Sequence, residues 1–182
     1  GALPHTCKEV PLHFADSHSY QMVCGYRRTL SFPENLGKRV FLQFDGAGHI
    51  ATLYVNGREA ASHRCGYTAF RTEVTELLRP GENRIAEKLD TTENPAVPPF
   101  GFVIDYLTYG GLYREVWLDV REESYITDVF VTTPALDTLM AQVKVCGTYD
   151  AIRLSVLDGE QLLVEAEGSA LQRITDPEAQ PW

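Results

Sequence analysis

The chain of 182 residues lacks the features that mark several large classes of protein. It has no apolar run of the ~18 to 20 residues that a membrane-spanning helix needs, and no basic-then-apolar leader at its start. Its 16 Lys and Arg residues are scattered, and 25 Asp and Glu residues bring the net charge to -9. Because nucleic-acid binding requires clustered positive charge, we expect neither nucleic acid nor membrane as a partner.

Cysteine and histidine are scarce, with four and five residues. The cysteines show no CxxC pair and no zinc-ligand spacing, so we expect no metal site and no cofactor in this chain. Four free thiols in a large intracellular fold are the favoured interpretation, which favours a cytoplasmic setting, although an even number also permits disulfides. His13, Asp16 and His18 could hold a divalent ion, but a solvated loop is the commoner explanation for such residues.

Long amphipathic helical patterns are also missing. Short β-branched or aromatic segments bounded by turn residues predict strands at 21–32, 39–45, 50–55, 84–89, 113–120, 126–133, 139–145, 151–157 and 161–166. Only residues 73–78 suggest a helical turn. The chain is therefore expected to be all-β.

The segment from Asp105 to Leu118 combines an acid, a paired-glycine turn and a strand. Gly110 and Gly111 allow backbone conformations and close approaches that a side chain would forbid. An aspartate just before such a turn lies at a rim, where its carboxylate can reach out of the fold.

Five sequence elements occur in order along about 115 residues. They are Leu-Pro-His-Thr at 3–6, Tyr-Arg-Arg at 26–28, Phe-Asp-Gly at 44–46 with a strand ending in Asn-Gly at 56–57, Gly-Tyr-Thr-Ala-Phe at 66–70 with the segment 74–83, and the segment 105–118. Together they resemble the amino-terminal region of glycoside hydrolase family 2, the β-galactosidase, β-glucuronidase and β-mannosidase group. Cys7 stands where that family has an aromatic residue, and Ala69 where it has proline.

The resemblance implies a jelly-roll, galactose-binding-like sandwich over residues 1–120. After the charged joint 121–124, residues 124–182 are expected to form a partial, incomplete immunoglobulin-like sandwich. We therefore expect the chain to be a fragment of a longer protein. Apolar positions of an incomplete sandwich lack cover, which predicts either disorder after about Val120 or self-association of two copies.

The implied function is that of a non-catalytic N-terminal fragment of a β-galactosidase-like enzyme. Its parent would hydrolyse terminal β-glycosides with retention through two glutamates on a barrel domain, which would be the partner of this chain. Glu115, Glu122 and Glu123 cannot replace that pair, because adjacent side chains on a strand point apart. The chain alone is expected to be inactive. The alternatives are a stand-alone carbohydrate-binding module or a β-sandwich interaction domain.

No catalytic residue is expected here, and two substrate-binding candidates depend on the barrel. The resemblance implies that Asp105 binds sugar hydroxyl groups, although it could equally cap its turn. Asn94 lies in the Pro-rich loop 91–101, whose aromatic residues could form the wall of a sugar pocket or simply attach the loop to the sandwich. Arg114 is expected to be structural.

Overall fold

A computed structural model describes residues 2–9, 21–33, 38–98 and 110–175. The chain divides into two compact units, Gly1–Val120 and Arg121–Trp182. Most of the described residues are in β-strands, and their single helical element is the 3-10 turn η2 (Thr75–Leu77). The predictions of an all-β chain and of a helical turn within 73–78 are confirmed.

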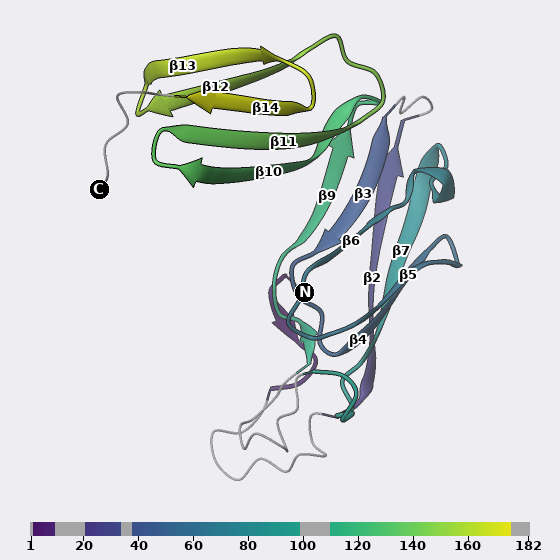
Figure 1. Cartoon of the computed structure of the whole chain (residues 1–182). Coiled ribbons are helices and arrows are strands. Elements are labelled where there is room, and N and C mark those ends of the chain that lie inside the picture. Colours follow the sequence, from purple (N-terminus) through teal and green to yellow (C-terminus); the bar gives the residue numbers. More distant parts are fainter. Residues whose placement is uncertain (1, 10–20, 34–37, 99–109, 176–182) are drawn as a thin grey trace. The chain divides into compact units, whose positions relative to one another are not determined.

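The first unit contains a four-stranded antiparallel sheet with the order β2-β7-β4-β5 (Figure 1). Its strands are β2 (Val23–Phe32), β7 (Gly81–Asp90), β4 (Ile50–Val55) and β5 (Arg58–Arg64). Asn56 and Gly57 join β4 to β5 with φ angles of 52° and 84°. Both residues thus have the positive φ that a tight hairpin turn of this kind requires, as the Asn-Gly pair predicts.

A second, three-stranded sheet has the order β6-β3-β9. It comprises β6 (Phe70–Glu73), β3 (Arg39–Phe44) and β9 (Val116–Arg121), while the short strands β1 (His5–Thr6) and β8 (Gly111–Leu112) pair separately. Apolar side chains from both larger sheets form one core. Its buried members are Phe32, Val40, Leu42, Phe44, Ala47, Ala51, Leu53, Val55, Val74, Ile85, Leu89 and Leu112. A core enclosed between two sheets defines a β-sandwich.

The second unit is built from β10 (Tyr125–Ala135), β11 (Thr138–Cys146), β14 (Leu171–Thr175) and the hairpin β12 (Ile152–Asp158) with β13 (Gln161–Gly168). Strands β10, β11 and β14 form one sheet in that order. Gln172 of β14 donates a hydrogen bond from Nε2 to the carbonyl oxygen of Ile152 at 2.7 Å, which links this sheet to the hairpin. Residues 125–175 therefore have regular structure, and the expectation of disorder after Val120 is wrong.

Most predicted strands occur with shifts of a few residues at their ends. Strand β7 begins at Gly81 instead of residue 84, and β9 begins at Val116 instead of residue 113. Five strands were not predicted: β1, β5, β6, β8 and β14. They are short or polar, as in the Arg-Glu-Ala-Ala-Ser-His-Arg sequence of β5, and they exist because a neighbouring strand supplies the hydrogen bonds.

Candidate functional site

Of the two substrate-binding candidates from the sequence, the structure describes only Asn94. Asp105 lies outside the described residues. Asn94 is half-buried in a short turn, where its Oδ1 accepts a hydrogen bond from the Ala96 amide at 2.9 Å and its carbonyl oxygen accepts one from the Val97 amide at 2.9 Å. The Asn94 carboxamide oxygen thus stabilises its own turn, and a role in sugar binding stays a prediction.

The paired glycines Gly110 and Gly111 are tightly packed against other parts of the chain. A Cβ atom on Gly110 would lie 1.9 Å from the Cγ2 atom of Thr91, and one on Gly111, whose φ is 138°, would lie 2.4 Å from the carbonyl oxygen of His5. Glycine is required at both positions because backbone segments approach closely there. This contact holds the N-terminal arm, residues 2–9, against strand β8.

One cavity of the first unit has a volume of about 640 Å³ and lies along the strands β2 and β9. In the described part of the chain these two are edge strands of their sheets. The lining is mostly apolar and includes Leu3, Leu30, Leu42, Phe44, Ile85, Leu112, Val116, Trp117 and Leu118. A concave apolar space of this size with a few polar groups is typical of a small-molecule or peptide site.

Among the described residues, Glu87 is the only acidic side chain that lines this cavity. It is 4% exposed, and neither carboxyl oxygen has a hydrogen-bond partner in the described part of the chain. Burial raises the pKa of Glu87 to about 8, because the charged form loses its hydration. The group is therefore largely protonated at neutral pH and can donate a hydrogen bond into the cavity.

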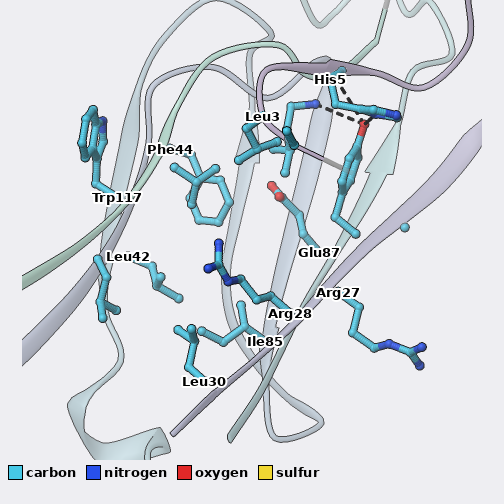
Figure 2. A pocket seen from close by; sticks show the side chains of 16 residues that line it. Leu3, His5, Arg27, Arg28, Leu30, Leu42, Phe44, Ile85, Glu87 and Trp117 are labelled. Atoms are coloured by element: carbon cyan, nitrogen blue, oxygen red, sulfur yellow. Dashed lines mark hydrogen bonds between the residues drawn. The ribbon is translucent and has the colours of Figure 1, made fainter. Parts of the chain in front are cut away.

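Tyr26 and Arg28 of the edge strand β2 are two residues apart, so they share one face of the strand, and both line this cavity. Figure 2 shows Arg28 and Glu87 directed into the cavity, whereas Arg27 points away from it. Glu87 lies opposite Tyr26 in the β2 to β7 register. The Tyr26 hydroxyl group is 2.9 Å from His5 Nδ1, and burial is the main cause that raises the pKa of Tyr26.

Glu87 was not singled out from the sequence, although a signal was present. In the predicted strand 84–89, the residues Ile85, Glu87 and Leu89 occupy alternate positions and so share one face of the sheet. A glutamate between two core residues should have been expected inside the sandwich.

A second, shallower hollow of about 580 Å³ is lined by Pro4, Asp45, Ala69, Tyr113, Arg114 and Glu115. The Asp45 carboxylate accepts hydrogen bonds from Gln43 Nε2 at 2.9 Å and from Trp117 Nε1 at 2.6 Å, and these donors lower its pKa. Arg114 lies over the Tyr113 ring, 5.5 Å from the ring centroid. These contacts attach β9 and the preceding loop to the sandwich, in agreement with the structural role expected of Arg114.

Metal ligands do not cluster in the part of the chain that the structure describes, where no group of three His, Cys, Asp or Glu residues could hold an ion. His13, Asp16 and His18 lie outside the described residues. His49 is buried, and burial lowers its pKa, so this imidazole is neutral at pH 7. Among the described helices, none is long and apolar enough to cross a membrane.

Comparisons with known proteins agree with this architecture. Residues 5–121 match the model of the glycosyl hydrolases family 2 sugar binding domain. The chain belongs to glycoside hydrolase family 2. The matched domain is a sugar-binding domain and not a cofactor-binding domain.

Two relatives of this family 2 chain have different enzyme names. It is 35% identical over 150 residues to a β-galactosidase of Thermoanaerobacter pseudethanolicus, which covers 81% of this chain and 20% of that protein. It is also 35% identical over 153 residues to a β-glucuronidase of Bacteroides fragilis, covering 80% of this chain and 22% of the relative. The chain thus spans about a fifth of the length of these relatives.

A solved structure confirms the β-sandwich fold of the family 2 chain. The crystal structure of an FMN-binding β-glucuronidase from Faecalibacterium prausnitzii L2-6 superposes with a TM-score of 0.81 at 25% sequence identity. The match covers 100% of this chain and 31% of that one. The sandwich architecture predicted from the sequence is therefore confirmed.

Proposed function

We propose that this chain is the non-catalytic N-terminal region of a β-galactosidase-like family 2 enzyme that hydrolyses terminal β-glycosides with retention. The observation that carries the proposal is the match of residues 5–121 to the family's sugar-binding domain, together with a relative of which the match covers only 20%. Carbohydrate and the enzyme's own catalytic barrel are the proposed partners, and no cofactor is proposed for this chain.

The described chemistry supports a non-catalytic role. Retaining glycosidases need two carboxyl groups about 5 to 5.5 Å apart. The cavity beside β2 and β9 contains one carboxyl group, that of Glu87, and no second acid lines it among the described residues. Bond cleavage by this chain alone is therefore not expected.

Incubation of the isolated chain with chromogenic galactosides and glucuronides tests this part of the proposal. We expect no turnover above that of a heat-denatured sample. Turnover that persists through repurification, and that disappears when Glu87 is replaced by Gln, would contradict the proposal.

Sugar binding through Asp105 and Asn94 is proposed only for the enzyme that contains the barrel. There, Asp105→Ala should raise KM more than tenfold, because a carboxylate accepts charge-assisted hydrogen bonds from sugar hydroxyl groups. Asn94→Ala should raise KM less, since Asn94 Oδ1 also holds its own turn. Unchanged KM in both variants would assign both residues to turn structure.

Free sugars should bind the isolated chain weakly. Calorimetric titration with galactose, glucose and glucuronate should give dissociation constants above about 1 mM, because one domain supplies only part of a pocket. Submillimolar binding of any of them would favour the alternative of a stand-alone carbohydrate-binding module.

We also propose that the second unit associates with another copy of this chain. Several apolar side chains on its strands are about half exposed: Ile126, Val129, Phe130, Val131, Leu157, Leu162 and Leu163. Strand β10 is an edge strand of its sheet in the described part of the chain. Exposed apolar residues on an edge strand favour pairing with a second chain.

A further inference from the structure

The cavity beside β2 and β9 is lined by side chains from both sheets of the first unit. Leu30 and Ile85 come from the four-stranded sheet, and Leu42 and Trp117 come from the three-stranded sheet. Leu3 of the N-terminal arm lines the same space. The cavity volume of about 640 Å³ lies within the range of ~300 to 1,000 Å³ that is usual for small-molecule sites. A mostly apolar molecule of moderate size therefore fits this space.

The Glu87 carboxyl group is the buried polar group of this cavity that lacks a partner. Its side chain is 4% exposed and points into the cavity from β7 (Figure 2). Neither carboxyl oxygen makes a hydrogen bond within the described part of the chain. A buried polar group without a partner has lost its hydration for nothing in return, so a ligand that supplies the partner gains affinity. Since its pKa is raised to about 8, Glu87 can donate one hydrogen bond at neutral pH.

The other polar side chains of the lining differ in what they can offer to a ligand. The Tyr26 hydroxyl group already lies 2.9 Å from His5 Nδ1, and it accepts a hydrogen bond from the Leu112 amide at 3.4 Å. Arg28 points into the cavity, whereas the neighbouring Arg27 points away from it (Figure 2). The permanent charge that a ligand meets inside the cavity is therefore positive.

Glu87 and Arg28 together select the head group of the ligand. A protonated Glu87 donates a hydrogen bond, and the planar guanidinium group of Arg28 donates charge-assisted ones. Both groups match a carboxylate, which combines a negative charge with acceptor oxygens. An ammonium head group would be repelled by Arg28, and it would require Glu87 to ionise in an apolar space. A neutral alcohol would satisfy Glu87 without using the charge of Arg28.

We propose that this cavity binds a small carboxylic acid with an apolar aryl or alkyl body, whose carboxylate accepts hydrogen bonds from Glu87 and Arg28. The body of the ligand contacts the apolar lining, which includes Leu42, Phe44 and Trp117. The inference is independent of the proposed glycosidase function, in which Glu87 and Arg28 have no role.

Titration of the full chain with phenylbutyrate tests the proposal. Amide chemical shifts of the nitrogen-15-labelled chain give both the dissociation constant and the place of binding. At pH 7 we expect a dissociation constant of about 1 mM or lower, as is usual for a ligand of this size, with the largest shifts in β2, β7 and β9. Phenylbutanol, which has the same body and a neutral head group, should bind at least about tenfold more weakly. Phenylbutylamine should not bind.

Two neighbouring arginines provide a matched pair of variants. Arg28→Gln should weaken the binding of phenylbutyrate at least about tenfold and leave the binding of phenylbutanol unchanged, because only the carboxylate uses the positive charge. Arg27→Gln removes the same charge from a side chain that points away from the cavity, so binding should change less than about twofold. Both arginines are exposed, and we expect both variants to fold.

The pH dependence of binding tests the contact with Glu87. Phenylbutyrate should bind the wild-type chain about tenfold more weakly at pH 9 than at pH 6, because loss of the Glu87 proton removes a donor and adds a like charge. Glu87→Gln keeps a donor, so it should bind the ligand at pH 6 and lose this dependence. The other titratable or charged groups that face Glu87 or interact with it, His5, Tyr26, Cys24 and Arg28, are unchanged in this variant.

Several results would overturn the proposal. They are equal affinities for phenylbutyrate and phenylbutanol, equal losses in the two arginine variants, and a pH dependence that Glu87→Gln does not remove. Chemical shift changes confined to the exposed apolar strands of the second unit would also overturn it, because they would place the ligand outside the cavity.

Discussion

The two units use the same strand pattern but differ in how much of it they bury. In the first unit, Val40, Leu53 and Val55 have no exposed surface, because two sheets enclose them. In the second unit, Val129, Phe130 and Val131 are 49%, 61% and 49% exposed. Alternation of apolar residues thus defines a face, while stability depends on whether another sheet covers that face.

Buried polar groups do not follow this contrast. Asn83 of the first unit is completely buried and makes four side-chain hydrogen bonds. Gln172 of the second unit is 6% exposed, and its Oε1 atom has no partner. Glu87 of the first unit is buried without a partner as well, so the hydrogen bonding of a buried polar group depends on its own surroundings and not on the unit that contains it.

The largest expected effect comes from truncating one phenylalanine in each unit. Phe44 is 2% exposed and stacks on Phe70 with ring centroids 4.8 Å apart. Phe44→Ala should destabilise the first unit by about 3 to 5 kcal/mol, whereas Phe130→Ala should cost under about 1 kcal/mol. Hydrogen exchange read separately for each unit measures both changes. Equal losses would break the contrast between the units.

Glu87→Leu should produce the next largest effect, and its direction depends on pH. The folded-state pKa of about 8 lies above the ordinary value of 4.5, so the contribution of Glu87 to stability is complete below pH 4.5 and is lost as pH rises through 8. The shift corresponds to at most about 5 kcal/mol, and solvent entry should reduce the measured loss to about 3 kcal/mol.

Urea unfolding of both proteins from pH 4 to 9 measures this dependence. Wild-type stability of the first unit should fall over the range, and Glu87→Leu should flatten the curve. Glu82→Gln, an exposed site on the same strand, should leave the curve unchanged. A wild-type curve that does not fall between pH 5 and 8 would show that Glu87 is ionised and paired in solution.

Asn83→Ala should cost about 2 kcal/mol in the first unit. The Asn83 side chain accepts from Asn56 Nδ2 at 2.8 Å and from the Arg79 amide at 2.9 Å, and it donates to the carbonyl oxygens of Arg79 and Gly81 at 2.7 and 2.9 Å. Removing it leaves buried polar groups without partners. Gln172→Ala should lower the unfolding free energy of the second unit by about half as much. Denaturation experiments in which Gln172→Ala costs more than Asn83→Ala would contradict this prediction.

The smallest effect on folding is expected for Phe130→Ser, at under about 1 kcal/mol, because this side chain is largely exposed. Its effect should instead be on self-association. Sedimentation at high concentration should show dimers of the wild-type chain and at least a tenfold weaker association of the variant. A monomeric wild-type chain with full hydrogen-exchange protection of residues 124–166 would show that the second unit is complete by itself.

The sequence by itself determined the all-β class, most strand positions and the hairpin at Asn56 and Gly57, because these depend on local periodicity and on permitted φ angles. It also determined the family, since the five motifs follow one another along the chain and can be recognised without the fold. It did not reveal strand β5, whose polar sequence becomes a strand by pairing with β4.

Only the tertiary structure decided the properties of the cavity and of the contact between the N-terminal arm and strand β2. The alternation around Glu87 indicates a face, but its burial, the absence of a partner for its carboxyl group and its raised pKa arise from what packs over that face. The approach of the Cys7 sulfur to the Tyr26 hydroxyl group, at 3.9 Å, likewise depends on the pairing of β1 with β8 and of β2 with β7. Contacts between residues distant in the chain arise from sheet assembly, and local sequence carries no direct signal for them.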